Sequence, residues 1–169
     1  STARRVYAQL NHMPLGTYQP GVRDAIEGAC RLVKEGGAHA VKLEGGQAMI
    51  DRIAAIAEID VPVVAHIGLT PQSVHRMGGY RVQGRGPKAH ARLLRDAQAV
   101  QEAGAFALVL EGIPRELAAE ITAAVQIPTI GIGAGIACDG QVLVLHDLLG
   151  LSETPAPSFA RQYVSLQDV

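Results

Sequence analysis

The chain has 169 residues, of which 48% are hydrophobic, and its 15 Lys and Arg nearly balance its 16 Asp and Glu. This length suits one domain with a sizeable core, and the net charge of -1 gives no reason to expect nucleic acid or an acidic membrane surface as a partner. No run of about 18 apolar residues is present, so we expect no transmembrane helix, and the N-terminus lacks the apolar run of a secretory signal.

The spacing of apolar residues alternates along the chain between a helical and a strand-like pattern. Spacings of three and four predict helices, and short apolar runs predict strands. The predicted helices are 20–36, 50–57, 89–103 and 114–125, and the predicted strands are 40–43, 61–67, 106–111, 128–133 and 142–146. This order predicts a parallel sheet of five strands that is covered by helices on both faces.

Two stretches do not fit this alternation. The polar, glycine-rich segment 70–87 is longer than an ordinary connection, and long loops in compact domains are often functional. The segment 152–169 carries Pro155 and Pro157, and we expect an extended or helical tail there. We expect residues 1–169 to form a single, partial domain.

Polar side chains recur where the predicted strands end, at Lys42 with Glu44, His66, Glu111, and His146 with Asp147. Successive side chains of a strand point to opposite faces, so Lys42 and Glu44 project together. Ligands bind at this end of the strands in open α/β sheets and in (β/α)8 barrels. Alone, the pair is equally consistent with a structural ion pair at the end of a sheet.

The other polar positions also have two interpretations each. Glu111 ends an apolar strand, where a carboxylate can act as a general base, or it can favour the dipole of the helix that follows. His66 can donate to a substrate oxygen or be a structural histidine. The glycines at 131–135 do not match G-x-G-x-x-G because residue 136 is Ile, so NAD is not expected, and the histidines lack zinc-site spacings.

Six short motifs occur in order along the chain: VKLEGG at 41–46, HIGLTPQS at 66–73, GYRVQGR at 79–85, LVLEGIP at 108–114, IGIGAG at 130–135 and DGQVLV at 139–144. Together they resemble the ketopantoate hydroxymethyltransferase family over about residues 14–150. The resemblance implies an α/β fold of the (β/α)8 TIM-barrel family, here incomplete, with about five parallel strands and flanking helices. It also implies a homo-oligomer.

The resemblance further implies the transfer of a hydroxymethyl group from 5,10-methylenetetrahydrofolate to 3-methyl-2-oxobutanoate, which gives 2-dehydropantoate in pantothenate biosynthesis. A divalent metal, usually Mg²⁺, chelates the 2-oxo acid, and a base removes a proton to form an enolate. By motif match, Lys42 contacts the substrate oxyanion, Glu44 supports the metal shell, Glu111 accepts the proton and His66 lines the same pocket. The implied partners are the small 2-oxo acid and the folate.

Two aspartates that hold the metal in this family have no match here. The chain has no Gly-Asp-Ser, and His12 stands where the family has its second aspartate. His12 is therefore a candidate metal ligand beside Glu44, although Mg²⁺ prefers oxygen ligands. We expect that the early strands with the first aspartate are missing, and that C-terminal helices are cut off after Val169.

Two other interpretations of the function stay open. A remnant without catalytic activity would cover its edge strand by self-association. Another enzyme of the phosphoenolpyruvate-using barrel superfamily would also act on metal-chelated 2-oxo acids, although the motif at 80–85 is typical of the hydroxymethyltransferases.

The two cysteines, Cys30 and Cys138, lie in no CxxC motif, and we expect reduced thiols in a cytoplasmic protein.

Overall fold

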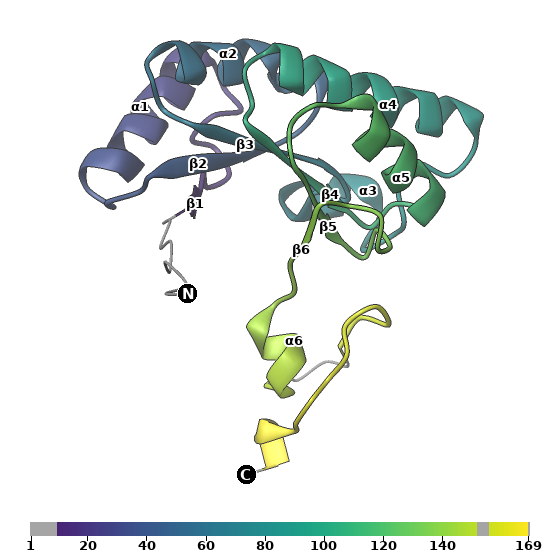
Figure 1. Cartoon of the computed structure of the whole chain (residues 1–169). Coiled ribbons are helices and arrows are strands. Elements are labelled where there is room, and N and C mark those ends of the chain that lie inside the picture. Colours follow the sequence, from purple (N-terminus) through teal and green to yellow (C-terminus); the bar gives the residue numbers. More distant parts are fainter. Residues whose placement is uncertain (1–9, 152–155, 169) are drawn as a thin grey trace, which may run out of the picture.

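In the computed structural model, which describes residues 10–151 and 156–168, six parallel strands form one sheet (Figure 1). The strands lie side by side in chain order: β1 (Leu10–His12), β2 (Ala40–Glu44), β3 (Val63–Gly68), β4 (Ala107–Glu111), β5 (Thr129–Ile132) and β6 (Gly140–Gln141). Parallel strands in sequential order, joined by helices, are the arrangement of a (β/α)8 barrel. The predicted fold class is confirmed, and the described strands form an open section of such a barrel.

The four long helices agree with the predicted ones to within a few residues at each end. They are α1 (Val22–Lys34), α2 (Ile50–Glu58), α4 (Pro87–Glu102) and α5 (Arg115–Ala124). Short helical segments lie between or after them: η1 (Gln47–Met49), η2 (Pro71–Ser73), α3 (Val74–Met77), α6 (Leu145–Leu149) and η3 (Leu166–Asp168). The long helices form one layer above the sheet in Figure 1.

The hydrophobic core lies between this helical layer and one face of the sheet. Val41, Leu43 and Leu108 of the strands pack there with Ile53 of α2 and Ile121 of α5, and all five are buried. The prediction that helices cover both faces was wrong. Right-handed crossovers between strands that follow in chain order place every long helix on the same side.

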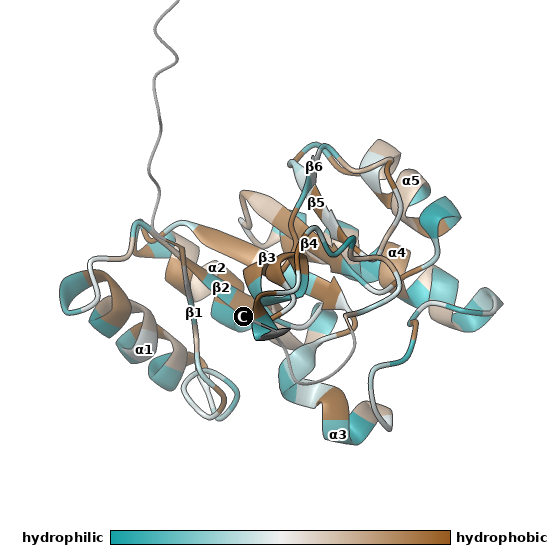
Figure 2. Ribbon diagram, turned by 90° about the horizontal axis from the view of Figure 1, so that it is seen from below, coloured by the Kyte–Doolittle hydropathy of each residue, from teal (hydrophilic) through white to brown (hydrophobic). Residues whose placement is uncertain are grey.

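The opposite face of the sheet carries a small apolar cluster of Val64, Ala107 and Val109, together with polar side chains near the strand ends. Figure 2 views the molecule from this side, with the helical layer behind the strands. Residues paired across parallel strands point to the same face, so the register assigns Lys42 and Glu44 to this face as well. This face is therefore the one available to a ligand.

The two edges of the sheet differ from the prediction. The strand β1 was not predicted, and the strand predicted at 142–146 was wrong, because β6 ends at Gln141 and α6 contains His146 and Asp147. One further bond, from the Val142 amide to the Gly131 carbonyl at 3.0 Å, precedes the departure of the chain from the sheet. His146 and Asp147 therefore do not end a strand.

Beyond β6 the chain extends away from the sheet, as Figure 1 shows. In the predicted tail, residues 156–165 contain no helix, and the short helical turn η3 follows them. Tail residues 152–155 and 169 lie outside the described residues. Within the described part of the chain, no helix combines the length and apolarity needed to cross a membrane.

Candidate active site

The sheet register brings the predicted residues of three strands to one edge. Glu44 of β2 pairs with His66 of β3, and Gly68 of β3 pairs with Glu111 of β4. The Lys42 Nζ lies 3.1 Å from His66 Nδ1, and His66 Nε2 lies 3.1 Å from Glu111 Oε2. The imidazole of His66 therefore lies between an ammonium group and a carboxylate, in a row that crosses three strands.

The neighbours of His66 determine which ring nitrogen carries its proton. A lysine ammonium only donates, so His66 Nδ1 accepts from Lys42 and the ring proton of the neutral imidazole lies on Nε2. The side chain is 3% exposed, and Nε2 has no aligned acceptor among the described residues, because the contact with Glu111 is close but lacks hydrogen-bond geometry. A buried donor without a partner is costly, so this N–H is suited to a substrate oxygen.

Lys42 is a partly buried cation with an acidic surrounding. Burial lowers the pKa of its ammonium group, while the carboxylates of Glu44 and Glu111 act in the opposite direction. Its Nζ lies 3.9 Å from Glu44 Oε1, and its side chain is 20% exposed. A cation held at the rim of an apolar environment stabilises negative charge that develops on a bound molecule.

Two residues that the sequence analysis did not single out hold Glu44 in place. The backbone amide of Gln72 donates to Glu44 Oε2 at 2.9 Å. The Tyr18 hydroxyl accepts from the Glu44 amide at 3.2 Å and donates to Gln72 Oε1 at 2.8 Å. Burial raises the pKa of Tyr18 to about 12, which keeps this donor protonated. Gln72 lies in the HIGLTPQS motif at 66–73, and this motif was the sequence signal that could have identified it as a site residue.

His12 ends β1 in register with Lys42, and its Nε2 lies 3.5 Å from Glu44 Oε1. Burial, with smaller effects of Lys42 and His66, lowers the pKa of His12 to about 4. The ring is therefore neutral near pH 7, and its Nε2 accepts from the side-chain amide of Gln72. His12 is thus not an ion-pair partner of Glu44.

A divalent metal does not fit the described residues on their own. Among residues 10–151 and 156–168, no three His, Cys, Asp or Glu side chains are arranged to hold a metal ion. Of the Glu44 oxygens, Oε2 accepts from the Gln72 amide and Oε1 faces the Lys42 ammonium. Glu44 and His12 are close, but two groups that already have partners do not make a Mg²⁺ site.

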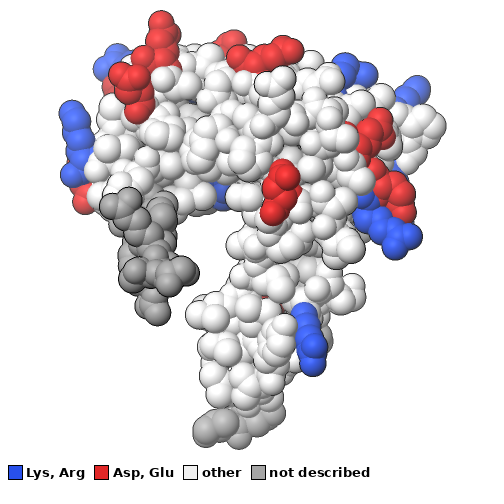
Figure 3. All heavy atoms as spheres, in the orientation of Figure 1, with Lys and Arg blue, Asp and Glu red and all other residues white. Residues whose placement is uncertain are grey.

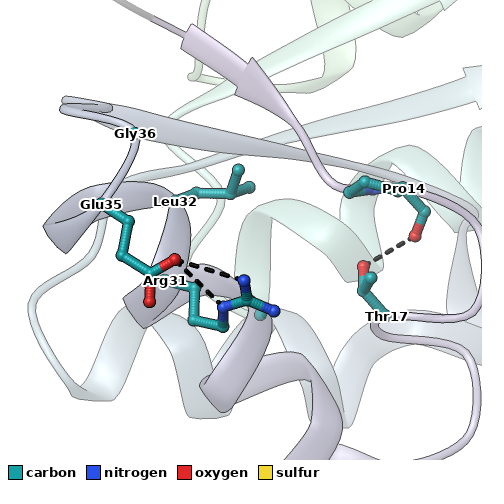
Figure 4. A pocket seen from close by; sticks show the side chains of 7 residues that line it. Pro14, Thr17, Arg31, Leu32, Glu35 and Gly36 are labelled. Atoms are coloured by element: carbon teal, nitrogen blue, oxygen red, sulfur yellow. Dashed lines mark hydrogen bonds and ion pairs between the residues drawn. The ribbon is translucent and has the colours of Figure 1, made fainter.

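A surface cavity of about 350 Å³ lies elsewhere, beside α1 and the loop that follows β1 (Figure 4). Its lining includes Pro14, Thr17, Leu32 and the ion pair of Arg31 with Glu35. None of the predicted site residues lines it. We therefore assign the candidate site to the row at the strand ends and not to this cavity.

Comparisons with known proteins agree with the motifs. The model of the family described as ketopantoate hydroxymethyltransferase matches residues 3–169. A 3-methyl-2-oxobutanoate hydroxymethyltransferase of Geobacter sulfurreducens is 65% identical over 151 residues, which are 89% of this chain and 57% of that protein. One of Syntrophotalea carbinolica is 59% identical over 157 residues, 93% of this chain and 59% of that protein. The chain thus spans somewhat more than half the length of these relatives.

Solved structures with the same fold are more distant in sequence. A proposed phosphonomutase of Burkholderia cenocepacia has a TM-score of 0.52 at 18% identity and covers 75% of this chain and 56% of its own. A proposed lyase or mutase of the same species also has a TM-score of 0.52, at 20% identity over 81% of this chain and 50% of its own. This likeness concerns the fold alone.

Proposed function

Because the chain belongs to the ketopantoate hydroxymethyltransferase family, we propose that it carries the substrate-binding and proton-accepting part of the site for this reaction. The proposed reaction converts 3-methyl-2-oxobutanoate, 5,10-methylenetetrahydrofolate and water into 2-dehydropantoate and tetrahydrofolate. The observation that supports the proposal is the row of Lys42, His66 and Glu111, with 3.1 Å between successive groups. The proposed location is the cytoplasm, where free thiols such as Cys30 and Cys138 stay reduced.

The row offers each group that enolate formation requires. Lys42 binds an oxygen of the 2-oxo acid by charge, and the Nε2–H of His66 donates to the keto oxygen as negative charge develops there. Glu111 then accepts the proton of C3, and the electron pair of the broken C–H bond forms the C2–C3 double bond of the enolate. These three residues act on one small molecule at the ends of β2, β3 and β4.

The second half of the proposed reaction forms one carbon–carbon bond. The enolate C3 attacks the methylene carbon that 5,10-methylenetetrahydrofolate delivers, and the carbon–nitrogen bonds to the folate break. Water supplies the hydroxyl oxygen, so tetrahydrofolate leaves and the keto group is restored. Within the described residues, Lys42 and His66 keep the oxygen of the enolate bound while this bond forms.

Glu44 and His12 remain the proposed contacts of the metal expected from the family, but further oxygen ligands have to come from outside the described residues or from the 2-oxo acid. When Mg²⁺ is titrated into the chain alone, calorimetry should give a dissociation constant of roughly 10⁻³ M or weaker. Tighter binding that is lost in Glu44→Gln would show a complete metal site.

A transfer assay tests the proposed function. The chain is incubated with 3-methyl-2-oxobutanoate, 5,10-methylenetetrahydrofolate and Mg²⁺, and 2-dehydropantoate is measured by mass spectrometry. We expect product above the level of Glu111→Gln, with Glu116→Gln, an exposed acid of α5, as the matched control. Equal product from the chain and from Glu111→Gln would refute the proposed role of Glu111 in catalysis.

A further inference from the structure

Positive charge is concentrated in one part of a nearly neutral chain. The stretch 61–95 contains six Lys and Arg and no Asp or Glu, whereas the whole chain has 15 of the former and 16 of the latter. It begins just before β3, includes β3 and α3, and continues into α4. Two of its cations, Arg76 and Arg81, lie in the segment between β3 and α4.

The loop 69–83 within this stretch is fixed to the candidate site at both ends. The Leu69 amide donates to the Glu111 carbonyl at 2.7 Å, and the Gln83 amide donates to the Gly112 carbonyl at 2.8 Å. Both ends of the loop thus bond to adjacent carbonyls at the end of β4, which is the closed form of an Ω-loop. In addition, the Gln72 amide of the loop binds Glu44 Oε2.

Two arginines of this loop, Arg76 at the end of α3 and Arg81 after it, are exposed. Neither forms an ion pair within the part of the chain that the structure describes. Some exposed cations of the chain do form such pairs, since Arg23 pairs with Glu27 and Arg115 with Glu116. Guanidinium groups without a partner bind carboxylates in a bidentate way, which makes them suited to an anionic ligand.

We propose that the loop 69–83 binds the glutamate tail of the folate co-substrate through Arg76 and Arg81. This inference rests on the proposed function, which requires the methylene carbon of the folate to meet the substrate beside Glu111. The tail carries its carboxylates at the far end of the same molecule, so they lie outside the buried row. The 2-oxo acid is too small to reach both places, and in the proposed reaction its oxygens are bound by Lys42 and His66.

The position of the loop connects the two parts of this folate site. Because Leu69 and Gln83 bond to the carbonyls of Glu111 and Gly112, the loop begins and ends beside the proton acceptor. Figure 2 shows α3 beside the sheet rather than over the helical layer. A ligand that reacts at Glu111 and extends outward therefore meets this loop.

Binding of folates with different tails tests the inference. The affinities of 5-formyltetrahydrofolate with one and with three γ-linked glutamates are measured by calorimetry on the full chain. We expect the triglutamate to bind about tenfold more tightly, because several exposed charge pairs each contribute a modest amount. In Arg76→Gln/Arg81→Gln this gain should fall below about twofold, and in the wild type it should shrink as salt is added.

The matched control is Arg23→Gln/Lys34→Gln, which removes the same charge from exposed positions of α1 and should keep the tenfold gain. Equal affinities of the two folates for the wild type, an equal loss in the control, or no folate binding at all would overturn the inference. Failure of the proposed function is recognised separately, because proton exchange at C3 of the 2-oxo acid is measured without folate.

Discussion

Lys42 combines burial with contacts to an imidazole and a carboxylate, and this combination makes it the most direct residue to test. Truncation by Lys42→Ala leaves the oxygen of a bound 2-oxo acid without its cation. We expect the affinity for 3-methyl-2-oxobutanoate to fall by about tenfold or more, since a hydrogen bond to a charged group contributes roughly 1.5–3 kcal/mol. Isothermal calorimetry measures the change, and Lys34→Ala, an exposed lysine of α1, is the control. An unchanged affinity would mean that Lys42 and Glu44 form a structural pair.

His12 gives the candidate site a dependence on pH. Its pKa is lowered from 6.5 to about 4 in the folded chain, so the unfolded chain takes up a proton first as the pH falls. The contribution of His12 to the free energy of unfolding is therefore fully present above pH 6.5, and it is lost as the pH falls toward 4.

Urea unfolding between pH 7 and pH 4 tests this role of His12. The slope of the free energy of unfolding against pH should be smaller in His12→Gln than in the wild type, and His75→Gln, an exposed histidine of α3, should keep the wild-type slope. Identical slopes for all three proteins would show that His12 titrates as in the unfolded chain.

At the scale of elements, the end of β3 is held against the end of β4 by a close approach of their backbones. Gly68 ends β3 with a φ of +94°, and a Cβ at this position would overlap the Glu111 carbonyl oxygen. Gly79 has a similar φ of +104° but open space around it. Gly68→Ala combines backbone strain with overlap, whereas Gly79→Ala adds strain alone.

We therefore expect Gly68→Ala to lower the free energy of unfolding by about 2 kcal/mol or more, and Gly79→Ala to lower it by about 1 kcal/mol. Chemical denaturation of the two variants measures the difference. Equal losses would mean that the contact between β3 and Glu111 is looser than described.

The strands in the middle of the sheet could be predicted from their apolar runs, but the edge strands could not. The three residues of β1 contain only one apolar side chain, Leu10, and no periodicity can indicate so short a strand. The run Val142, Leu143, Val144, Leu145 has the composition of a buried strand, yet these side chains are 36–60% exposed. The composition of this run predicts a buried strand, but it does not indicate that the last strand of the sheet ends before the run, at Gln141.

The residues of the candidate site divide in the same way. Lys42, Glu44, His66 and Glu111 could be found because each follows a run of apolar residues, and parallel strands bring such positions to one edge. Gln72 and Tyr18 could not, because their roles depend on contacts over 28 and 26 residues of chain, from a backbone amide and from a hydroxyl group. The spacing of apolar residues carries no information about such contacts, and only the HIGLTPQS motif marks the segment that contains Gln72.

At the scale of the whole molecule, exposed apolar side chains gather on the C-terminal segment, which is defined here as residues 142–151 and 156–168. Such a surface favours self-association. Val142, Leu145, Tyr163 and Val164 are all exposed, and few charged groups appear on this segment in Figure 3. Among residues 10–151 and 156–168, β1 and β6 are the edge strands of the sheet, and their outer backbone groups are not paired with another strand. We propose that a second copy of the chain covers this surface, in agreement with the homo-oligomer expected from the family resemblance.

Sedimentation velocity over a range of concentrations should therefore show reversible association of the chain. Leu145→Glu introduces a charge into the C-terminal segment and should weaken association by about tenfold or more, since burying an unpaired charge is costly. Leu15→Glu, at an equally exposed position after β1, should leave association unchanged. A chain that stays monomeric at every concentration would contradict the proposal.

We propose above all that Glu111 removes a proton from a 2-oxo acid that Lys42 and His66 bind. Proton NMR in D2O measures it most directly, as the loss of the C3 proton signal of 3-methyl-2-oxobutanoate, with and without Mg²⁺. We predict exchange faster than in buffer, slower by about 100-fold or more in Glu111→Gln, and unchanged in Glu116→Gln. Exchange no faster than in buffer, or equally fast in Glu111→Gln, would contradict the account.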